Sequence, residues 1–244
     1  MPWPDYLQPL AKGSMPIEKS VYECAIVGCD SIWVVCNDDV APMVRHRLGD
    51  YVLDPEIFAR WQFVKNKEDH KRFIPIFYVS IGQKDRARRD SLGWSILEGS
   101  LSAFLAANNI SKWSRPSKYF VSFPYGLYNP LALRESRKTI KDSSNLLVSY
   151  NNQTVKNNKY LPFTFRPDQW VEFKRVIKNS CTGGDKNLPP QERWSSRNLT
   201  LDKIFINDII VEENILEIDE YYDLESWENL RNYYRSTLTI EKPP

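Results

Sequence analysis

The densest group of charged side chains in the sequence lies at residues 84–90, Lys-Asp-Arg-Ala-Arg-Arg-Asp. Its guanidinium groups belong to Arg86, Arg88 and Arg89, and guanidinium groups bind phosphate and carboxylate oxygens through paired hydrogen bonds. The group follows an apolar segment, residues 73–81, that predicts a buried strand, and it precedes a predicted helix. Open α/β sheets bind ligands outside the carboxyl ends of their strands, so we expect an anion-binding site here. The alternative is a solvated loop whose own aspartates neutralise the arginines.

Three further positions offer contacts to a nucleotide or a metal ion. Lys12 and Gly13 lie in a loop before a predicted helix and could reach a phosphate group, although a surface turn also explains them. Asp223 directly precedes the last predicted helix, where a carboxylate serves either as a metal ligand or as a helix cap. Asp38 and Asp39 end a predicted strand, and we interpret them as capping residues of the next helix.

Several aromatic residues are candidates for base stacking. Tyr119, Tyr125 and Tyr128 surround a predicted turn at Pro124–Gly126, whereas Trp113, Trp194 and Trp227 are scattered along the chain. Aromatic residues spaced in this way belong more often to a core or to an interface than to a stacking platform.

The clearest structural unit is a helix followed by a strand within residues 14–36. Ile17, Val21 and Ala25 recur at helical spacing, and Ser14 is placed to cap the helix. Gly28 is expected to end this helix, and the apolar run that follows it predicts a strand buried in a sheet. A strand–helix–strand unit needs an earlier strand, for which the chain leaves six residues before residue 7.

The remaining pattern alternates strands with helices. We predict strands at 73–81, 118–123, 146–150, 160–165 and 215–218, and helices at 39–48, 55–63, 91–108, 167–178, 201–207 and after 223. A β-hairpin is expected around Asn151 and Asn152, with 154–155 in its second strand, and a polar mobile loop is expected at 179–197. The sequence therefore predicts one α/β domain over residues 1–244, with three layers, a mainly parallel or mixed sheet and a hairpin insertion.

Composition limits the functional classes. The 244 residues are 42% hydrophobic and 13% aromatic, enough for a bulky core, and 33 basic against 31 acidic residues give a net charge of +2. Nucleic acid is therefore not an expected partner. Neither a membrane-spanning run nor a secretion leader is evident, so we expect no membrane partner and a cytoplasmic location. The four cysteines form no C-x-x-C pair and two histidines supply few zinc ligands, which predicts buried free thiols in a reducing compartment.

Two short motifs resemble the sugar-nucleotidyltransferase superfamily, which has a glycosyltransferase-A-like fold. The segment 7–37, LQPLAKGSMPIEKSVYECAIVGCDSIWVVCN, is similar to the family's Leu-x-Pro stretch, its helix and the strand after it. The segment 222–230, YDLESWENL, is similar to the family's closing acidic motif. The helix after the arginine group also resembles the family's base-recognition segment. A looser likeness links the chain to uncharacterised proteins of tailed bacterial viruses.

The resemblance implies a protein that binds a nucleotide or nucleotide-sugar and, if active, transfers a nucleotidyl group to a sugar phosphate with Mg²⁺. The family's glycine-rich phosphate signature is absent, and its Pro-Lys lysine would fall near Asp5. The strand-end carboxylate is also missing at Phe123–Gly126, which leaves Asp223 as the one metal ligand of the pattern. The alternative is an inactive relative that serves as an interaction or structural protein of a tailed virus, in the host cytoplasm or in the virion.

Overall fold

The computed structural model describes residues 4–10, 13–61, 72–86, 89, 91–190, 192–193, 195–196, 199–205, 214–238 and 240. The strands of this part are β1 (Ile32–Val35), β2 (Tyr51–Leu53), β3 (Phe73–Val79), β4 (Tyr119–Val121), β5 (Gly126–Leu127), β6 (Leu146–Ser149), β7 (Phe163–Phe165), β8 (Asn214–Glu217) and β9 (Tyr222–Asp223). The helices are α1 (Pro16–Val27), α2 (Ala41–Leu48), α3 (Pro55–Trp61), α4 (Gln83–Arg86), α5 (Leu92–Ile110), α6 (Ala132–Glu135), α7 (Arg137–Asp142), α8 (Trp170–Asn179), α9 (Leu201–Phe205) and α10 (Trp227–Arg235). Short 3-10 turns are η1 (Asp5–Leu7), η3 (Lys112–Ser114), η4 (Val155–Asn157) and η5 (Pro167–Gln169).

The described strands pair into three sheets, in the orders β1-β3-β2, β4-β7-β6-β8 and β5-β9. β1 pairs with β3, and β6 with β8, in parallel. The other pairs, β2 with β3, β4 and β6 with β7, and β5 with β9, are antiparallel. The two larger sheets are therefore mixed, as the sequence analysis allowed when it predicted a mainly parallel or mixed sheet, and the third, β5-β9, is antiparallel.

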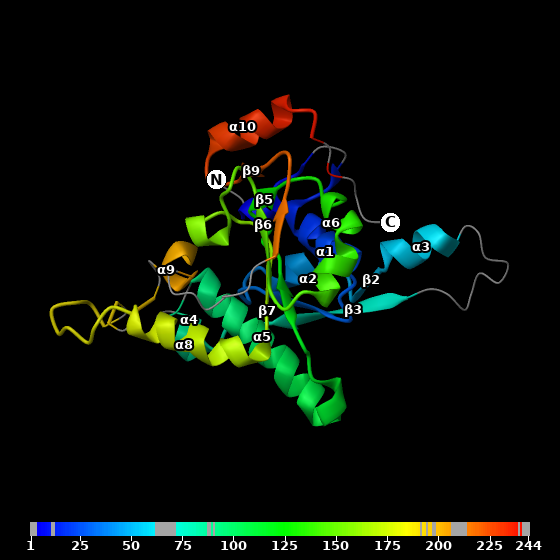
Figure 1. Ribbon diagram of the computed structural model, residues 1–244. Helices are drawn as coiled ribbons and strands as arrows, with labels where there is room; N and C mark the ends of the chain where they lie inside the picture. Colours follow the sequence, from blue (N-terminus) through cyan, green and yellow to red (C-terminus); the bar gives the residue numbers. More distant parts are fainter. Residues whose placement is uncertain are drawn as a thin grey trace.

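Helices cover the sheets on both faces, as the alternation of β6 shows. Leu146 and Val148 pack in a cluster with residues of α1 and α7, whereas Leu147 packs in a second cluster with residues of α5 and α8. In Figure 1, β6 and β7 run between α8 and α5 on one side and α1 and α6 on the other. A strand that is buried on both faces reads as a continuous apolar run, and this is how the sequence signals the three layers.

Helix α1 is close to its prediction, but its amino-terminal cap differs. Met15 is the N-cap residue, and its backbone N–H donates to Glu18 Oε2 at 2.8 Å. The predicted cap, Ser14, instead donates its hydroxyl proton to the carbonyl of Ile240 at 3.3 Å, which ties the helix start to the end of the chain. Gly28 ends the helix at φ +87°, in the left-handed region that favours glycine.

The predicted hairpin has its turn but not its second strand. Asn151 and Asn152 have φ values of 50° and 60°, and Tyr150 bridges Gln153, as expected of a tight turn. The chain then enters η4, and the strand that returns against β6 is β7. Loop 179–197 has no helix or strand after Asn179 in its described residues, and its mobility remains a prediction. The last two residues of the helix predicted at 55–63 lie outside the described part.

An ion pair lies on the buried side of α1. Lys19 and Glu23, one helical turn apart, are salt-bridged with fully buried side chains. Glu23 also accepts a hydrogen bond from the Ser122 hydroxyl, and the Lys19 ammonium lies 4.3 Å from the ring centre of Tyr128. Charges that are buried to this degree must be paired, because each has lost its hydration.

Candidate functional site

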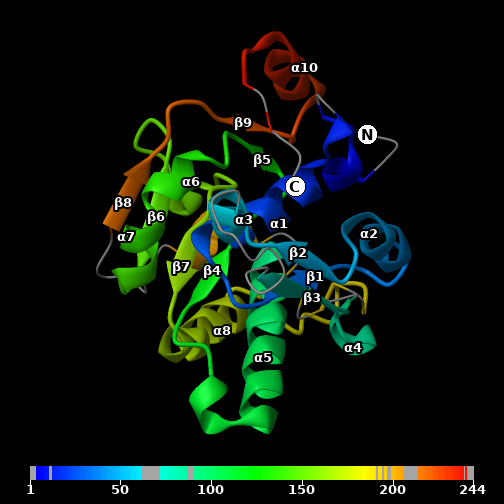
Figure 2. The ribbon, with the colours of Figure 1, turned by 90° about the vertical axis from the view of Figure 1, so that its right-hand side faces the viewer.

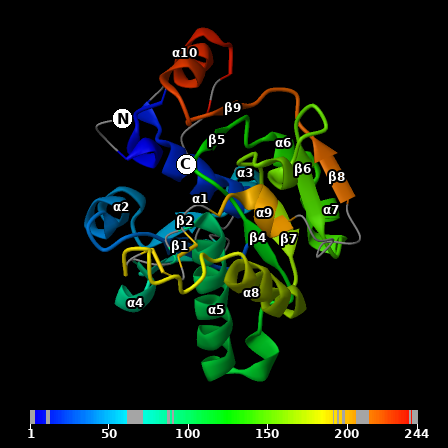
Figure 3. The same ribbon diagram turned by 90° about the vertical axis from the view of Figure 1, so that its left-hand side faces the viewer.

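The predicted arginine group lies at the carboxyl ends of two parallel strands. α2 follows β1 and α4 follows β3, and Figures 2 and 3 show both helices on the same side of this sheet. Arg86 closes α4 and forms an ion pair with Asp38, which follows β1. The parallel register of β1 and β3 brings these two residues together although 48 positions separate them in the chain. The site is therefore built from two strand ends, as expected for an open α/β sheet.

The two described arginines of the group differ in their partners. Arg89 pairs with Asp85 at 3.2 Å, within the group itself, and its guanidinium lies 4.3 Å from the ring centre of Trp94. Their side chains remain 35% exposed at Arg86 and 31% at Arg89, so solvent reaches both. The buried Nε–H of Arg86 has no hydrogen-bond partner. The charge of Arg89 is thus neutralised by an aspartate of its own group, as the solvated-loop alternative predicts. The charge of Arg86 is neutralised by Asp38, which follows a different strand.

The start of α5 lies next to these arginines. Ser91 is the N-cap residue, and its hydroxyl oxygen accepts a hydrogen bond from Trp94 N at 3.4 Å. Free amides at a helix start favour anions. Asp38 is not a cap: the N-cap of α2 is Val40, which makes no side-chain cap bond, so our capping interpretation of Asp38 and Asp39 was wrong. Arg88 lies outside the described residues.

The loop before α1, at Gly13, forms a turn that is already hydrogen-bonded to α2. Gly13 has φ +72°, and its carbonyl oxygen accepts a hydrogen bond from Arg47 Nη2 at 2.8 Å. Arg47 also pairs with Glu18 at 2.8 Å, which fastens the end of α2 to the start of α1. Lys12 lies outside the described part of the chain. Sequence reasoning missed Arg47, whose one signal was a basic run at the end of a helix.

Aromatic rings gather beside the end of β4. Tyr125 lies 6.3 Å from Tyr6 and 5.2 Å from Tyr160 between ring centres, and Phe123 lies 6.1 Å from Tyr160. Burial raises the pKa of Tyr6, and Cys36, which follows β1, raises it further. Tyr6 therefore lies near the residue that follows β1, and Tyr125 links it to the rings at the end of β4. Tyr119 and Tyr128 do not join them, since Tyr119 packs on Phe165 and Tyr128 is buried beside Lys19.

Asp223 is held by neighbouring protein groups. Its carboxylate accepts hydrogen bonds from the backbone N–H of Glu225 at 3.2 Å and from the Asn229 side chain. Lys159 Nζ lies 4.0 Å from its other oxygen, so a cation already faces it. Ser226, not Asp223, is the N-cap of α10. Among the described residues no group of three or more His, Cys, Asp or Glu could hold a metal ion.

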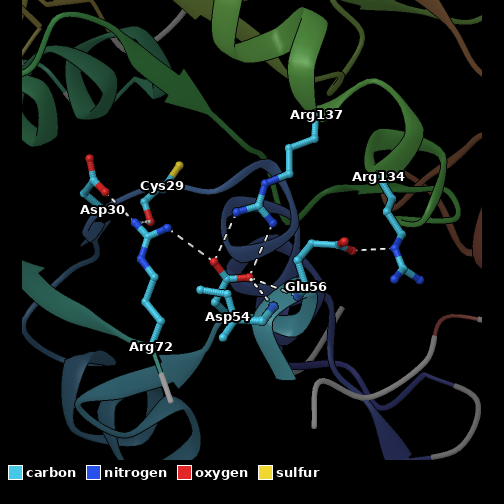
Figure 4. Close-up of polar contacts among 8 residues, drawn as sticks. Cys29, Asp30, Asp54, Glu56, Arg72, Arg134 and Arg137 are labelled. Carbon is cyan, nitrogen blue, oxygen red and sulfur yellow. Dashed lines mark hydrogen bonds and ion pairs between the residues drawn. The ribbon is translucent and has the colours of Figure 1, made fainter. Parts of the chain in front are cut away.

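A second cluster of arginines lies at the opposite edge of the same sheet (Figure 4). Asp54 accepts hydrogen bonds from Arg137 at 3.1 and 3.3 Å and forms a salt bridge with Arg72 at 3.3 Å. Burial opposes ionisation of Asp54, but the hydrogen bonds and charge of Arg137, together with the backbone N–H groups of Glu56 and Ile57, outweigh it and hold the pKa of this carboxyl below its ordinary value. Arg72 also contacts Asp30 and the carbonyl of Cys29.

This second cluster is a structural junction. Asp54 accepts from the backbone N–H groups of Glu56 and Ile57 at 3.0 and 3.4 Å and so caps α3. Its arginines come from the start of β3 and from α7, and the Arg137 guanidinium lies where a Cβ on Gly28 would stand. Each of the two arginines has a carboxylate partner, which leaves no uncompensated charge for a ligand.

A partly open pocket of about 340 Å³ lies between described residues of the loop at 179–197 and the start of α9. Hydroxyl groups dominate its lining, which comprises Ser180, Thr182, Glu192, Ser195, Ser196, Leu199 and Lys203. The four described cysteines are free and half-buried, so the predicted thiols are present but less buried than expected.

Comparison with known proteins gives a structural likeness and no sequence relative. No family model matches the chain, and no curated protein is similar to it in sequence. A nucleoside-diphosphate-sugar pyrophosphorylase from Vibrio cholerae is similar in structure, with a TM-score of 0.55 and 12% identity over 97% of this chain and 93% of that chain. Rv0371c from Mycobacterium tuberculosis has a TM-score of 0.49, with 13% identity over 96% of this chain and 91% of that chain. Its complex with manganese has a TM-score of 0.48, with 13% identity over 96% and 92%.

Nearly full coverage by the Vibrio cholerae structure shows that the likeness extends along the whole chain and not over a single motif. Mixed sheets between two layers of helices agree with it. The chain therefore has a nucleotidyltransferase-like α/β fold.

Proposed function

We propose that this protein binds a nucleotide or nucleotide-sugar at the carboxyl edge of β1 and β3, where Arg86 and Arg89 contact its phosphate groups. The observation that carries the proposal is the position of Arg86, at the ends of two parallel strands and beside the start of α5. Phosphate carries more charge than the Asp38 carboxylate and offers more acceptor oxygens, so it competes for the same guanidinium. Lys12, Gly13 and Arg88 remain part of the proposed contact region.

The aromatic group beside β4 supplies the second half of the proposed site. Tyr6 and Tyr125 are half-buried and form an apolar surface next to the end of β1. A base or a sugar ring stacks favourably on such a surface. The phosphates would then lie toward the arginines and the ring toward the tyrosines.

The surroundings of Asp223 do not fit a resident Mg²⁺ ion. Mg²⁺ takes oxygen ligands in a strict octahedral arrangement, whereas Asp223 faces the Lys159 ammonium and is hydrogen-bonded to Asn229. Nucleotidyl transfer to a sugar phosphate, with release of pyrophosphate, needs Mg²⁺ to offset charge on the α-phosphate. We therefore propose binding and derive no transfer step through a resident metal.

Calorimetric titration of the full chain with ATP, GTP, CTP and UTP, with and without Mg²⁺, tests the proposal. Loss of one charge-assisted contact costs about 1.5–3 kcal/mol, reduced where solvent screens the pair. Arg86→Ala with Arg89→Ala should therefore weaken binding at least about tenfold. Arg175→Ala is the matched control, since Arg175 is exposed on α8 and pairs with its own helix neighbour Glu172.

Three results would count against the site. No heat at about millimolar concentration of any nucleotide would overturn the binding proposal. Unchanged affinity in the double variant would place the ligand elsewhere. Loss of the far-ultraviolet circular dichroism signal in the double variant would show that these arginines are structural.

A second function, an inactive fold relative acting as an interaction or structural protein, is supported by the commitment of Asp223 to protein groups. Its proposed setting is a tailed virus, in the host cytoplasm or the virion. Co-sedimentation of the native protein with virus particles would support it, and nucleotidyl transfer by a free monomer would exclude it.

A further inference from the structure

The most exposed apolar side chains of the described residues include two at the end of α5. Ile110 is 81% exposed and Trp113 in η3 is 97% exposed, and Leu105, five residues before Ile110, is 48% exposed. Figures 1, 2 and 3 all show the carboxyl end of α5 and the segment after it extending beyond the other elements. We call residues 105–118 the α5 tip. Exposed apolar groups that gather at one protruding end of the molecule, apart from the core, are a candidate interaction surface.

Positive charge surrounds these apolar groups. Residues 101–134 contain no aspartate or glutamate, and the tip contains Lys112, Arg115 and Lys118. The Lys118 ammonium is engaged by backbone carbonyls, including those of Lys141 at 2.9 Å and Ser143 at 2.8 Å. Burial lowers the pKa of Lys118, and the nearby Asp142 offsets part of this effect. Lys118 is therefore already engaged by protein groups, and we assign it to the base of the tip and not to its exposed end.

The outer charges of the tip are uncompensated. Arg115 donates to the side-chain oxygen of Asn108 at 2.9 Å and lies 5.3 Å from the ring centre of Phe104, both neutral partners. No ion pair is present for Lys112 in the described structure, and its side chain is exposed. The tip thus presents an exposed isoleucine and an exposed tryptophan in the same segment as two cations.

The charge of the tip, its small apolar area and the types of its side chains indicate which kind of partner it fits. A second copy docked tip to tip would bring like charges together, which is unfavourable. Two or three side chains bury far less than the roughly 800 Å² per partner of a stable protein interface. Nucleic acid would stack on Trp113, but Ile110 and Leu105 have no stacking surface for bases. A convex tip with an indole, an aliphatic side chain and cations instead suits the headgroup region of a membrane that contains anionic lipids.

We propose that the α5 tip binds the surface of anionic lipid membranes, with Trp113 and Ile110 entering the headgroup region and Lys112 and Arg115 attracting the lipid charge. This proposal departs from the sequence expectation of no membrane partner, which rested on the lack of a membrane-spanning run. No helix in the described residues is long and apolar enough to cross a membrane, but surface contact needs none. The contact is independent of the proposed nucleotide site.

Co-sedimentation with vesicles tests the proposal. We expect the full chain to bind phosphatidylcholine vesicles that contain phosphatidylserine, and to bind pure phosphatidylcholine at least about fivefold more weakly. Salt at about 0.5 M should reduce the binding, because it screens exposed charges. Trp113→Ala should lower the partition coefficient at least about fivefold. Trp227→Ala is the matched control, since Trp227 is 60% exposed on α10, near Glu225 and Glu228, and should bind as the parent does.

Several results would overturn the inference. One is the absence of binding to anionic vesicles at low salt, and another is equal binding by Trp113→Ala and its parent. Light scattering provides an independent check: a dimer that Trp113→Ala dissociates would assign the tip to a second copy. Both variants should keep the parent's urea midpoint, because these indole rings are mostly in solvent.

Discussion

Removal of the Asp54 charge should destabilise the fold, although Asp54 lies far along the sheet from the proposed site. Its carboxylate is fully buried between Arg137 and Arg72, whose side chains are 26% and 33% exposed. Loss of one partner of a buried ion pair costs about 3–5 kcal/mol. Because solvent still reaches both arginines, we take the lower end, and expect Asp54→Asn to lower the free energy of unfolding by about 3 kcal/mol.

Asparagine is the informative substitution because it caps helices about as well as aspartate. The α3 cap bonds to Glu56 and Ile57 can therefore survive, and the measured loss reports the charge. Asp30→Asn is the matched control: Asp30 is 98% exposed and shares the same Arg72, so its removal should leave the urea midpoint nearly unchanged.

The pH dependence gives a second readout for the Asp54 carboxyl. Its pKa is lowered in the folded state, so its stabilisation is present above the unfolded pKa of about 3.9 and is lost as pH falls through the folded value. The parent should thus lose more stability than Asp54→Asn between about pH 5 and pH 2. Urea unfolding measures both effects, provided that the free energy of unfolding falls with urea concentration at the same slope in the parent and in the variant. A loss below about 1 kcal/mol for Asp54→Asn at neutral pH would refute the reasoning.

Two more perturbations follow from close packing and from the buried ion pair. Gly126→Ala should lower the free energy of unfolding by more than about 2 kcal/mol, because its Cβ would stand 2.2 Å from the carbonyl oxygen of Tyr160. Gly183→Ala is the control and should not lower it, because nothing lies within 4 Å of the Cβ that would be added. The urea midpoints of the two variants measure the difference, and equal midpoints would contradict the β5 geometry. Glu23→Gln should cost about 3–5 kcal/mol near pH 7, since it leaves Lys19 charged and buried. Burial already lowers the pKa of Lys19, so the deficit should shrink as pH rises and Lys19 deprotonates, and a pH-independent deficit would argue against this cause.

The elements with strong periodicity were predictable from sequence. Helix α5 was expected at 91–108 and lies at Leu92–Ile110, and the strand expected at 73–81 is β3, Phe73–Val79. The short strands β4 and β7 lie inside longer apolar runs and were predicted, whereas β2 and β5 were not, because each is a run of two or three residues without a period and is held by pairing with another strand. The prediction that Ser14 caps α1 was wrong because Ser14 bonds instead to Ile240, at the other end of the chain, and local spacing contains no information on so distant a partner.

The candidate site was predictable in position but not in its pairing. A charged loop between a strand and a helix indicated the edge of the sheet, and the structure has Arg86 there. Its partner Asp38 was assigned to capping, because local spacing contains no information on which strand lies next to which. The parallel pairing of β1 with β3 decides that contact, and the Asp54 junction likewise joins residues from four segments.

Affinity for nucleotide in Asp38→Asn and Arg86→Ala, measured by the same titration, tests the central claim most directly. If phosphate binds the Arg86 guanidinium, it competes with the Asp38 carboxylate, so the two substitutions must act in opposite directions. We predict that Asp38→Asn strengthens nucleotide binding and that Arg86→Ala weakens it, with the circular dichroism spectrum of both unchanged. Equal affinity in all three proteins, or weaker binding in Asp38→Asn, would contradict the proposed site.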